Sequence, residues 1–174
     1  MRFSEFLKED QTVPQLQQKI QQGFPDTKKR QHVTHEVTIK SLTCATLKLK
    51  KLLRISSTTT SNGNEYKQFM DIRNVEFQPS DSGNTVPIRG LYGNYHDITP
   101  SELNSTNVGV YCNCQDYQMR FAYYNVQNNC HVGAPPKPYT KTSDRPEVNP
   151  QHVPGMCKHL LKLTEELKKQ KILQ

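Results

Sequence analysis

The sequence predicts an α+β fold, in which a small antiparallel β-sheet is flanked by helical segments near both ends of the chain. Apolar and polar residues alternate through much of residues 33–99, as in strands that bury one face. Apolar residues recur at helical spacing within residues 1–25 and, most clearly, within residues 156–171. We therefore divide the chain into a helical arm with a basic linker (1–31), an antiparallel β region (32–107) and a C-terminal region (108–174).

The N-terminal arm is expected to form one or two short helices. Thr12 is a suitable N-cap, Pro14 falls in the first turn, and Gly23 would end the helix. The apolar face of the arm comprises Phe3, Phe6, Leu7, Leu16 and Ile20. Two interpretations stay open: the arm lies on its own domain, or it docks on a partner. The polar linker that follows contains Lys28, Lys29 and Arg30.

The β region is expected to contain about four or five strands. Asn62-Gly63 is a strong hairpin signal because both residues tolerate a positive φ. Cys44, alone among the strand residues, is expected to be a small core side chain. The alternating apolar positions are Val37 and Ile39, Leu47 and Leu49, Leu53 and Ile55, then Ile72, Val75 and Phe77 on the return, with a further strand over 88–95.

The C-terminal region is expected to start with a strand at 108–111 and to continue into a helical stretch. Tyr117, Phe121 and Tyr124 share one face of that stretch and are expected in the core. Residues 132–155 hold six of the eleven prolines, which favours a long extended loop. The last helix, residues 156–171, would bury Met156, Leu160, Leu163 and Leu167.

Composition suggests that this fold needs additional support. Hydrophobic residues make up 33% of the 174 residues, below the usual share of roughly 45–50%. A bound metal or a partner subunit would compensate for so thin a core.

The net charge of +7 suits a soluble basic surface or contact with nucleic acid. We find no membrane span and no signal peptide, and five cysteines, an odd number, argue against a closed disulfide set.

Two tight pairs of metal-ligand residues, Cys112-Asn113-Cys114 and Cys157-Lys158-His159, stand out. Together they supply the four thiolate and imidazole ligands that Zn²⁺ takes in a tetrahedral structural site, with no position left open for water. The first pair ends a predicted strand and the second begins a predicted helix. A zinc ion held by Cys112, Cys114, Cys157 and His159 would therefore join the sheet to the C-terminal helix. Two alternatives remain for the ligand set. Cys130 or His131 could replace one ligand, or four thiolates could hold zinc or an iron–sulfur cluster.

These residues carry a resemblance to a known family. Val-Tyr-Cys-Asn-Cys, followed by Pro-Gly-Met-Cys-Lys-His-Leu-Leu, resembles the SWIM zinc finger, whose pattern is CxC then CxH. The resemblance covers about residues 108–163 and maps the family's zinc-chelating positions onto the two pairs. The separation of 42 residues between Cys114 and Cys157 is longer than is usual there. Membership would imply zinc together with DNA or protein binding, and no catalysis.

A second, looser resemblance covers the same half of the chain. The string from Tyr111 to Asn125, with the later Asn-Pro-Gln-His-Val-Pro-Gly-Met-Cys-Lys-His-Leu, is similar to small proteins of tailed bacteriophages. That resemblance implies a virion component of the neck, tail or baseplate, and a virion location; a chain not encoded by a phage would be cytoplasmic.

The function we expect is that of a non-enzymatic, zinc-stabilised structural or interaction protein. Its partners would be other proteins of a large assembly, in several copies, with weak nucleic-acid contact, no membrane and no small-molecule substrate. The alternative is a SWIM-type nucleic-acid-binding module that uses Lys28, Lys29, Arg30, Lys48, Lys50, Lys51 and Arg54. The third hypothesis is a metal-dependent enzyme, such as a zinc hydrolase using His131 and Asp116. The sequence lacks a phosphate-binding glycine loop and the HExxH and GxSxG motifs.

Overall fold

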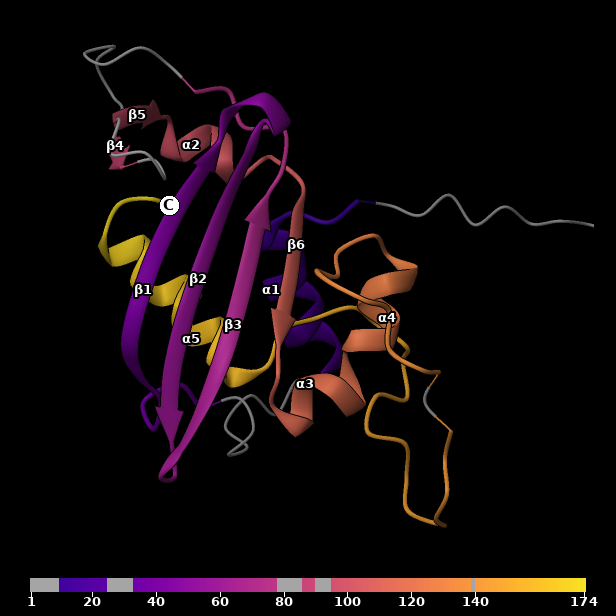
Figure 1. Ribbon diagram of the computed structural model, residues 1–174. Coiled ribbons are helices and arrows are strands. Elements are labelled where there is room, and N and C mark those ends of the chain that lie inside the picture. Colours follow the sequence, from indigo (N-terminus) through magenta and orange to yellow (C-terminus); the bar gives the residue numbers. More distant parts are fainter. Residues whose placement is uncertain (1–9, 25–32, 78–85, 90–94, 139) are drawn as a thin grey trace, which may run out of the picture.

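A four-stranded antiparallel sheet forms the centre of the computed structural model, which describes residues 10–24, 33–77, 86–89, 95–138 and 140–174 (Figure 1). Its strands, in the spatial order β1-β2-β3-β6, are β1 (Thr38–Leu47), β2 (Leu52–Ser61), β3 (Asn64–Ile72) and β6 (Val108–Cys112). The strands β4 (Val86–Arg89) and β5 (Tyr95–Ile98) form a separate two-stranded sheet. The expectation of one strand over 88–95 was therefore wrong, because Ile88 and Tyr95 lie on two paired strands.

The turns of the main sheet follow from a few residues with a positive φ. Asn62 and Gly63 have φ values of 51° and 76° and connect β2 to β3, which confirms the predicted hairpin. At the other end, Leu47 pairs with Leu52, so residues 48–51 must reverse the chain. They form the short helix η2 (Lys48–Lys50), followed by Lys51 at a φ of 47°. Leu49 is therefore fully exposed in a turn, and the prediction that it continues a strand was wrong.

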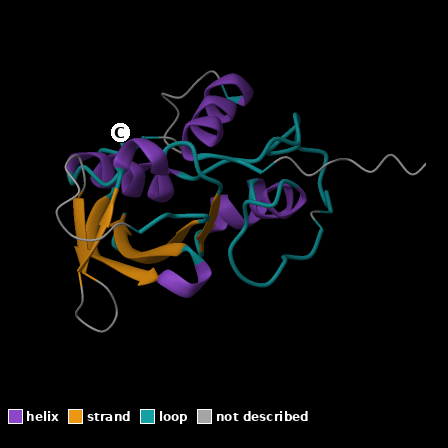
Figure 2. Cartoon of the chain, turned by 90° about the horizontal axis from the view of Figure 1, so that it is seen from above, coloured by secondary structure: helices purple, strands orange, loops and turns teal. Residues whose placement is uncertain are grey.

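Two helices, α1 (Val13–Gly23) and α5 (Lys158–Lys169), pack against the same face of the sheet (Figures 1 and 2). Inward side chains of β2, β3 and β6, such as Ile55, Met70 and Val110, are fully buried beneath them. Leu160, Leu163 and Leu167 of α5 are buried, as predicted. Met156 is buried as well, but it lies just before the helix begins.

The start of α1 is fixed by a capping box, in which Thr12 and Gln15 bond to each other's backbone N–H. Leu16 and Ile20 are buried in the common core, so this helix lies on its own domain. Phe3, Phe6, Leu7 and the basic residues 28–30 lie outside the described residues.

The helical stretch after β6 is divided into α3 (Gln115–Arg120) and α4 (Ala122–Gln127). A one-turn helix, α2 (Pro100–Leu103), lies between β5 and β6. Phe121 is the residue between α3 and α4, with a φ of −115° and a ψ of −35°. Tyr117, Phe121 and Tyr124 are buried nonetheless, which confirms that the predicted aromatic stripe belongs to the core.

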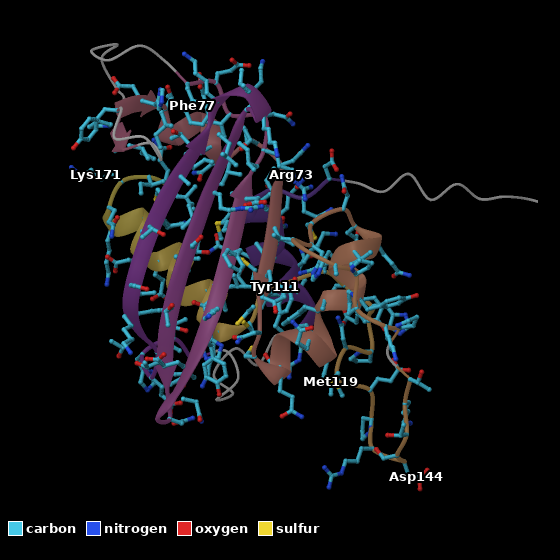
Figure 3. All side chains as sticks on the ribbon, viewed as in Figure 1. Arg73, Phe77, Tyr111, Met119, Asp144 and Lys171 are labelled. Atoms are coloured by element: carbon cyan, nitrogen blue, oxygen red, sulfur yellow. The ribbon has the colours of Figure 1, made fainter. Side chains whose placement is uncertain are left out.

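The proline-rich segment 132–155 contains no helix or strand in its described part, as predicted. It projects away from the sheet, with Asp144 near its far tip, and returns to the core before α5 (Figure 3). Residues 140–148 are exposed, whereas Asn149 and residues 154–157 are buried. None of the helices in the described part of the chain has the length and apolar character that crossing a membrane requires.

Candidate metal centre

The first ligand pair lies where β6 ends and α3 begins. Cys112 is the last residue of β6 and pairs with Gln68 of β3. Cys114 is the N-cap of α3, and its sulfur accepts a hydrogen bond of 3.3 Å from the backbone N–H of Tyr117. Asn113, between them, bonds through its side chain and backbone to the backbone of Lys67 on β3. The sequence Cys-Asn-Cys is therefore anchored to the sheet while both thiols turn inward.

The second pair lies at the start of α5. Cys157 occupies the N-cap position with extended backbone angles, and His159 lies in the first helical turn. The free N–H groups and the positive end of a helix stabilise negative charge at this place. The sheet thus contributes one pair of ligands and the terminal helix the other.

The segment that leads into α5 is held by Asn125 of α4. The Asn125 amide donates to the carbonyl oxygen of Gly155 at 3.0 Å and accepts from the N–H of Gly155 at 2.8 Å. Gly155 itself lies so close to Phe121 that a Cβ atom there would be 2.6 Å from the ring. A second buried amide, Asn149, bonds to the carbonyl oxygens of Arg120 and Val153. These contacts place Cys157 beside the Cys112–Cys114 pair.

All four candidate ligand atoms lie within 4.8 Å of one another. Nδ1 of His159 is 3.8 Å from the Sγ atoms of both Cys112 and Cys157. In a tetrahedron with Zn–S bonds of about 2.3 Å and Zn–N bonds of about 2.0–2.1 Å, ligand atoms are separated by roughly 3.5–3.8 Å. The four side chains are 0–3% exposed. The cluster has the size, ligand types and burial of a closed metal site.

Electrostatics give the cluster an affinity for a cation. Burial raises the pKa of the Cys157 thiol, and the neighbouring sulfurs of Cys112 and Cys114 raise it further. Burial also opposes ionisation of Cys112, but hydrogen bonds from Cys114, Cys157 and Gln68 outweigh burial and lower the pKa of that thiol. Three thiolates this close together repel one another, so full ionisation requires a positive charge among them.

Gln68 supports the cluster from the neighbouring strand. Its amide nitrogen lies 3.6 Å from Sγ of Cys112 and 3.0 Å from the hydroxyl of Thr59, while its amide oxygen accepts from Ser57 at 2.8 Å. Both ends of a buried amide are therefore occupied, and the N–H group is directed at the thiolate. An N–H···S bond of this kind stabilises negative charge on the sulfur.

The imidazole of His159 is oriented by packing. Its ring lies on the ring of Tyr66, with centroids 4.3 Å apart at 34°. Nδ1 faces the thiols, and Nε2 is buried without a hydrogen-bond partner among the described residues. A neutral imidazole that binds a metal through Nδ1 carries its proton on Nε2, so this orientation fits a metal ligand.

The other candidate residues lie elsewhere. Cys130 is buried beside the outer edge of β6, where its carbonyl oxygen accepts a hydrogen bond from the N–H of Val110. Burial raises the pKa of the Cys130 thiol to about 12. His131 bonds through Nδ1 to the hydroxyl of Tyr117 at 2.9 Å. Asp116 forms an ion pair with Arg120 at 2.9 Å. None of the three, nor Cys44, belongs to the described group of converging ligand atoms.

Sequence reasoning did not identify Gln68, Tyr66, Asn125 or Gly155 as parts of this site. One signal was present for Gln68, because it alternates with Met70 and Ile72 and so had to lie on the buried face of β3. A polar side chain in that position needs a partner. Its partners come from β2 and β6, and only the strand register reveals them. No family model, curated protein or solved structure matches the chain.

Proposed function

We propose that Cys112, Cys114, Cys157 and His159 bind one zinc ion and that this ion is structural. The observation that carries the proposal is the closed, buried set of four converging ligand atoms. A catalytic zinc needs an open coordination position for water or substrate, and these four side chains fill a tetrahedron without one. The ion would supply an electrostatic crosslink between the end of β6, the start of α3 and the start of α5. Three thiolates and an imidazole favour zinc over harder cations.

The role that we propose for the zinc-stabilised chain is that of a non-enzymatic structural component in a larger protein assembly. The tailed-phage resemblance suggests a virion part as the assembly. Two exposed features of the fold suit protein contacts: the projecting loop 140–148, and Leu49, fully exposed among the lysines of the β1–β2 turn. Contacts from neighbouring subunits would offset the roughly 1–2 kcal/mol per residue that ordering such a loop costs.

Cross-linking tests the assembly role. We would isolate the chain under mild conditions from the cells or particles that produce it, cross-link its lysines and identify the neighbours by mass spectrometry. We expect cross-links from Lys137 and Lys141 of the loop and from Lys48 and Lys50 of the turn to other proteins or to further copies of the chain. A chain that is recovered as a monomer without protein neighbours would contradict the proposal.

Proteolysis provides a second test. The loop presents Lys137, Lys141 and Arg145 on an exposed segment. Lys137 and Arg145 precede prolines, after which trypsin does not cut, so we expect trypsin to cut the free protein after Lys141. It should also cut in the linker at 28–30, while the assembled protein resists at both places. Equal resistance in the two states would remove the support for docking.

The second candidate function is nucleic-acid binding of the SWIM type. The exposed lysines 48, 50 and 51 of the β1–β2 turn favour it. Two of the expected cations are already paired, however: Lys51 with Glu76 at 2.5 Å, and Arg54 with Asp71 at 2.6 Å. We rank this function below assembly. Submicromolar binding of duplex DNA at physiological salt would reverse the order, because nonspecific contact gives only about 10⁻⁴–10⁻⁶ M there.

A further inference from the structure

The sheet face opposite α1 and α5 carries two aromatic rings on neighbouring strands. Phe69 of β3 lies directly opposite Tyr111 of β6, with ring centroids 5.9 Å apart and planes at 36°. Both rings are half-buried. Met70 and Val110 point toward the helices, so their neighbours Phe69 and Tyr111 point to the opposite face. Figure 3 labels Tyr111 on β6 and Arg73 just beyond the end of β3. The pair therefore offers aromatic surface near the β6 edge of a face that α1 and α5 do not cover.

Two hollows meet at this pair. The larger, about 530 Å³, lies between Phe69, Tyr111 and a wall formed by residues 131–134 and Pro136. The smaller, about 170 Å³, is lined by the hydroxyl groups of Ser56 and Thr58 and by Lys67. Phe69 lines both. A ligand crossing this face would meet flat apolar rings first and hydrogen-bonding side chains next to them.

Positive charge surrounds the rings. Arg54 lines the larger hollow, and two hydrogen bonds to Asp71, of 2.7 and 2.6 Å, fix the plane of its guanidinium group. Arg73 lies over Gly109, where a Cβ atom would be 2.6 Å from Nη2, and donates to the carbonyl oxygen of Asn129. Lys67 has no carboxylate within ion-pair distance in the described part of the chain. Cations thus outnumber carboxylates here, in a chain of net charge +7.

We propose that this face binds single-stranded nucleic acid, with bases stacked on Phe69 and Tyr111 and phosphates near Lys67 and Arg73. Every base has a π-face, so a pair of rings binds strands without regard to sequence, and nearby cations neutralise the backbone. A duplex keeps its bases stacked on one another and cannot present them to a flat sheet. The surface is separate from the metal centre and adds an activity to the proposed structural role.

Fluorescence anisotropy with the zinc-loaded full chain tests this proposal. The probes are a labelled thymidine oligonucleotide of about 12 nucleotides, within the length range of single-strand sites, and a duplex of the same length. We expect the single strand to bind more tightly than the duplex. Phe69→Leu should weaken strand binding about tenfold, in line with the loss of one base–aromatic stack. Tyr95→Leu, which removes an exposed aromatic ring on β5, should leave it unchanged.

Charge variants test the second half of the proposal. Lys67→Gln should weaken binding and make the salt dependence shallower, by about 0.7 in the log–log slope for one lost phosphate contact on a single strand. Lys168→Gln, on the exposed side of α5, should do neither. Unchanged zinc content and melting temperature in each variant would show that the fold is retained.

Any of four results would overturn the proposal. The first three are equal affinity for duplex and single strand, equal binding by wild type and Phe69→Leu, and a thymidine mononucleotide that binds as tightly as the oligonucleotide. Binding of a proline-rich peptide, with no strand binding, would also overturn it and assign the face to protein contact. None of these results bears on the zinc site, so the two proposals fail separately.

Discussion

The Sγ atom of Cys112, at the end of β6, lies 3.8 Å from Nδ1 of His159, in the first turn of α5. The two residues are 47 positions apart in the sequence, and the long proline-rich loop lies between them. The sheet and the terminal helix therefore meet at a cluster of atoms that could bind a metal ion. A metal bound there would close this loop in the folded chain, and its binding energy would add to the stability of the fold.

Replacing one ligand should greatly destabilise the protein. We expect Cys157→Ser to lower the free energy of unfolding by more than about 4 kcal/mol, a loss typical of only a few mechanisms, including loss of a metal. Chemical denaturation with zinc present measures it. Cys44→Ser is the matched control, because Cys44 is half-buried in β1 outside the cluster and should cost no more than about 1 kcal/mol. A Cys157→Ser variant as stable as the control would exclude the structural role.

Cys130 and Cys112 should behave differently when each is changed to serine. Cys130 lies outside the converging group, so Cys130→Ser should keep one zinc per chain, whereas Cys112→Ser should lose it. Elemental analysis after dialysis gives the metal content of each variant. The opposite pattern would place the ion among another set of sulfur atoms.

The two hydrogen bonds between the Asn125 side chain and the Gly155 backbone should stabilise the fold as much as a core contact. Asn125→Ala leaves the buried N–H and C=O of Gly155 without these partners, at about 1–3 kcal/mol for each group. We expect a loss of roughly 2–6 kcal/mol in thermal or chemical unfolding, together with weaker zinc retention. Gln127→Ala, on the exposed side of α4, should change the stability by less than about 0.5 kcal/mol. Similar melting temperatures for the two variants would show that Asn125 does not position the entry to α5.

The sequence predicts those features of the structure that neighbouring residues determine. The Thr12 cap, the Asn62-Gly63 turn and the spacing of the two ligand pairs each depend on neighbouring residues, so pattern alone located them. The ends of the sheet were harder to predict. Leu49 continues the alternation of β1 but lies in the reversal that the Leu47–Leu52 pairing imposes.

The residues that support the candidate metal centre are placed by contacts between segments far apart in the sequence. Gln68 reaches Cys112 only through the pairing of β3 with β6, which joins segments 44 positions apart. Asn125 meets Gly155 across 30 positions. Phe121, where α3 and α4 divide, packs against Phe24 and Gly155, which are distant in the sequence. Such contacts cannot be derived from periodicity or from residue type.

Acid should weaken the fold partly through His131. Burial lowers the pKa of this imidazole below its ordinary value of 6.5, although a hydrogen bond to the carbonyl of Ala134 opposes the shift. Below about pH 6.5 the unfolded chain takes up a proton that the folded chain does not, so the free energy of unfolding falls as the pH falls. Above that pH the contribution of His131 is fully present.

The variant His131→Gln isolates this contribution. Between about pH 7.5 and about pH 5.5, with zinc in constant excess, its stability should fall less than that of the wild type. His35→Gln, at an exposed histidine, should follow the wild type. Identical pH profiles for wild type and His131→Gln would show that His131 does not titrate differently in the folded state.

The metal content of the purified wild-type chain tests the central claim most directly. Elemental analysis by mass spectrometry, on protein dialysed against metal-free buffer, should give about one zinc per chain, as expected for one closed four-ligand site. A parallel sample treated with a strong chelator should lose that zinc and melt at a lower temperature, because metal-binding energy is folding energy in such sites. A wild-type chain with no zinc, with two zinc ions, or with coloured iron would contradict the account.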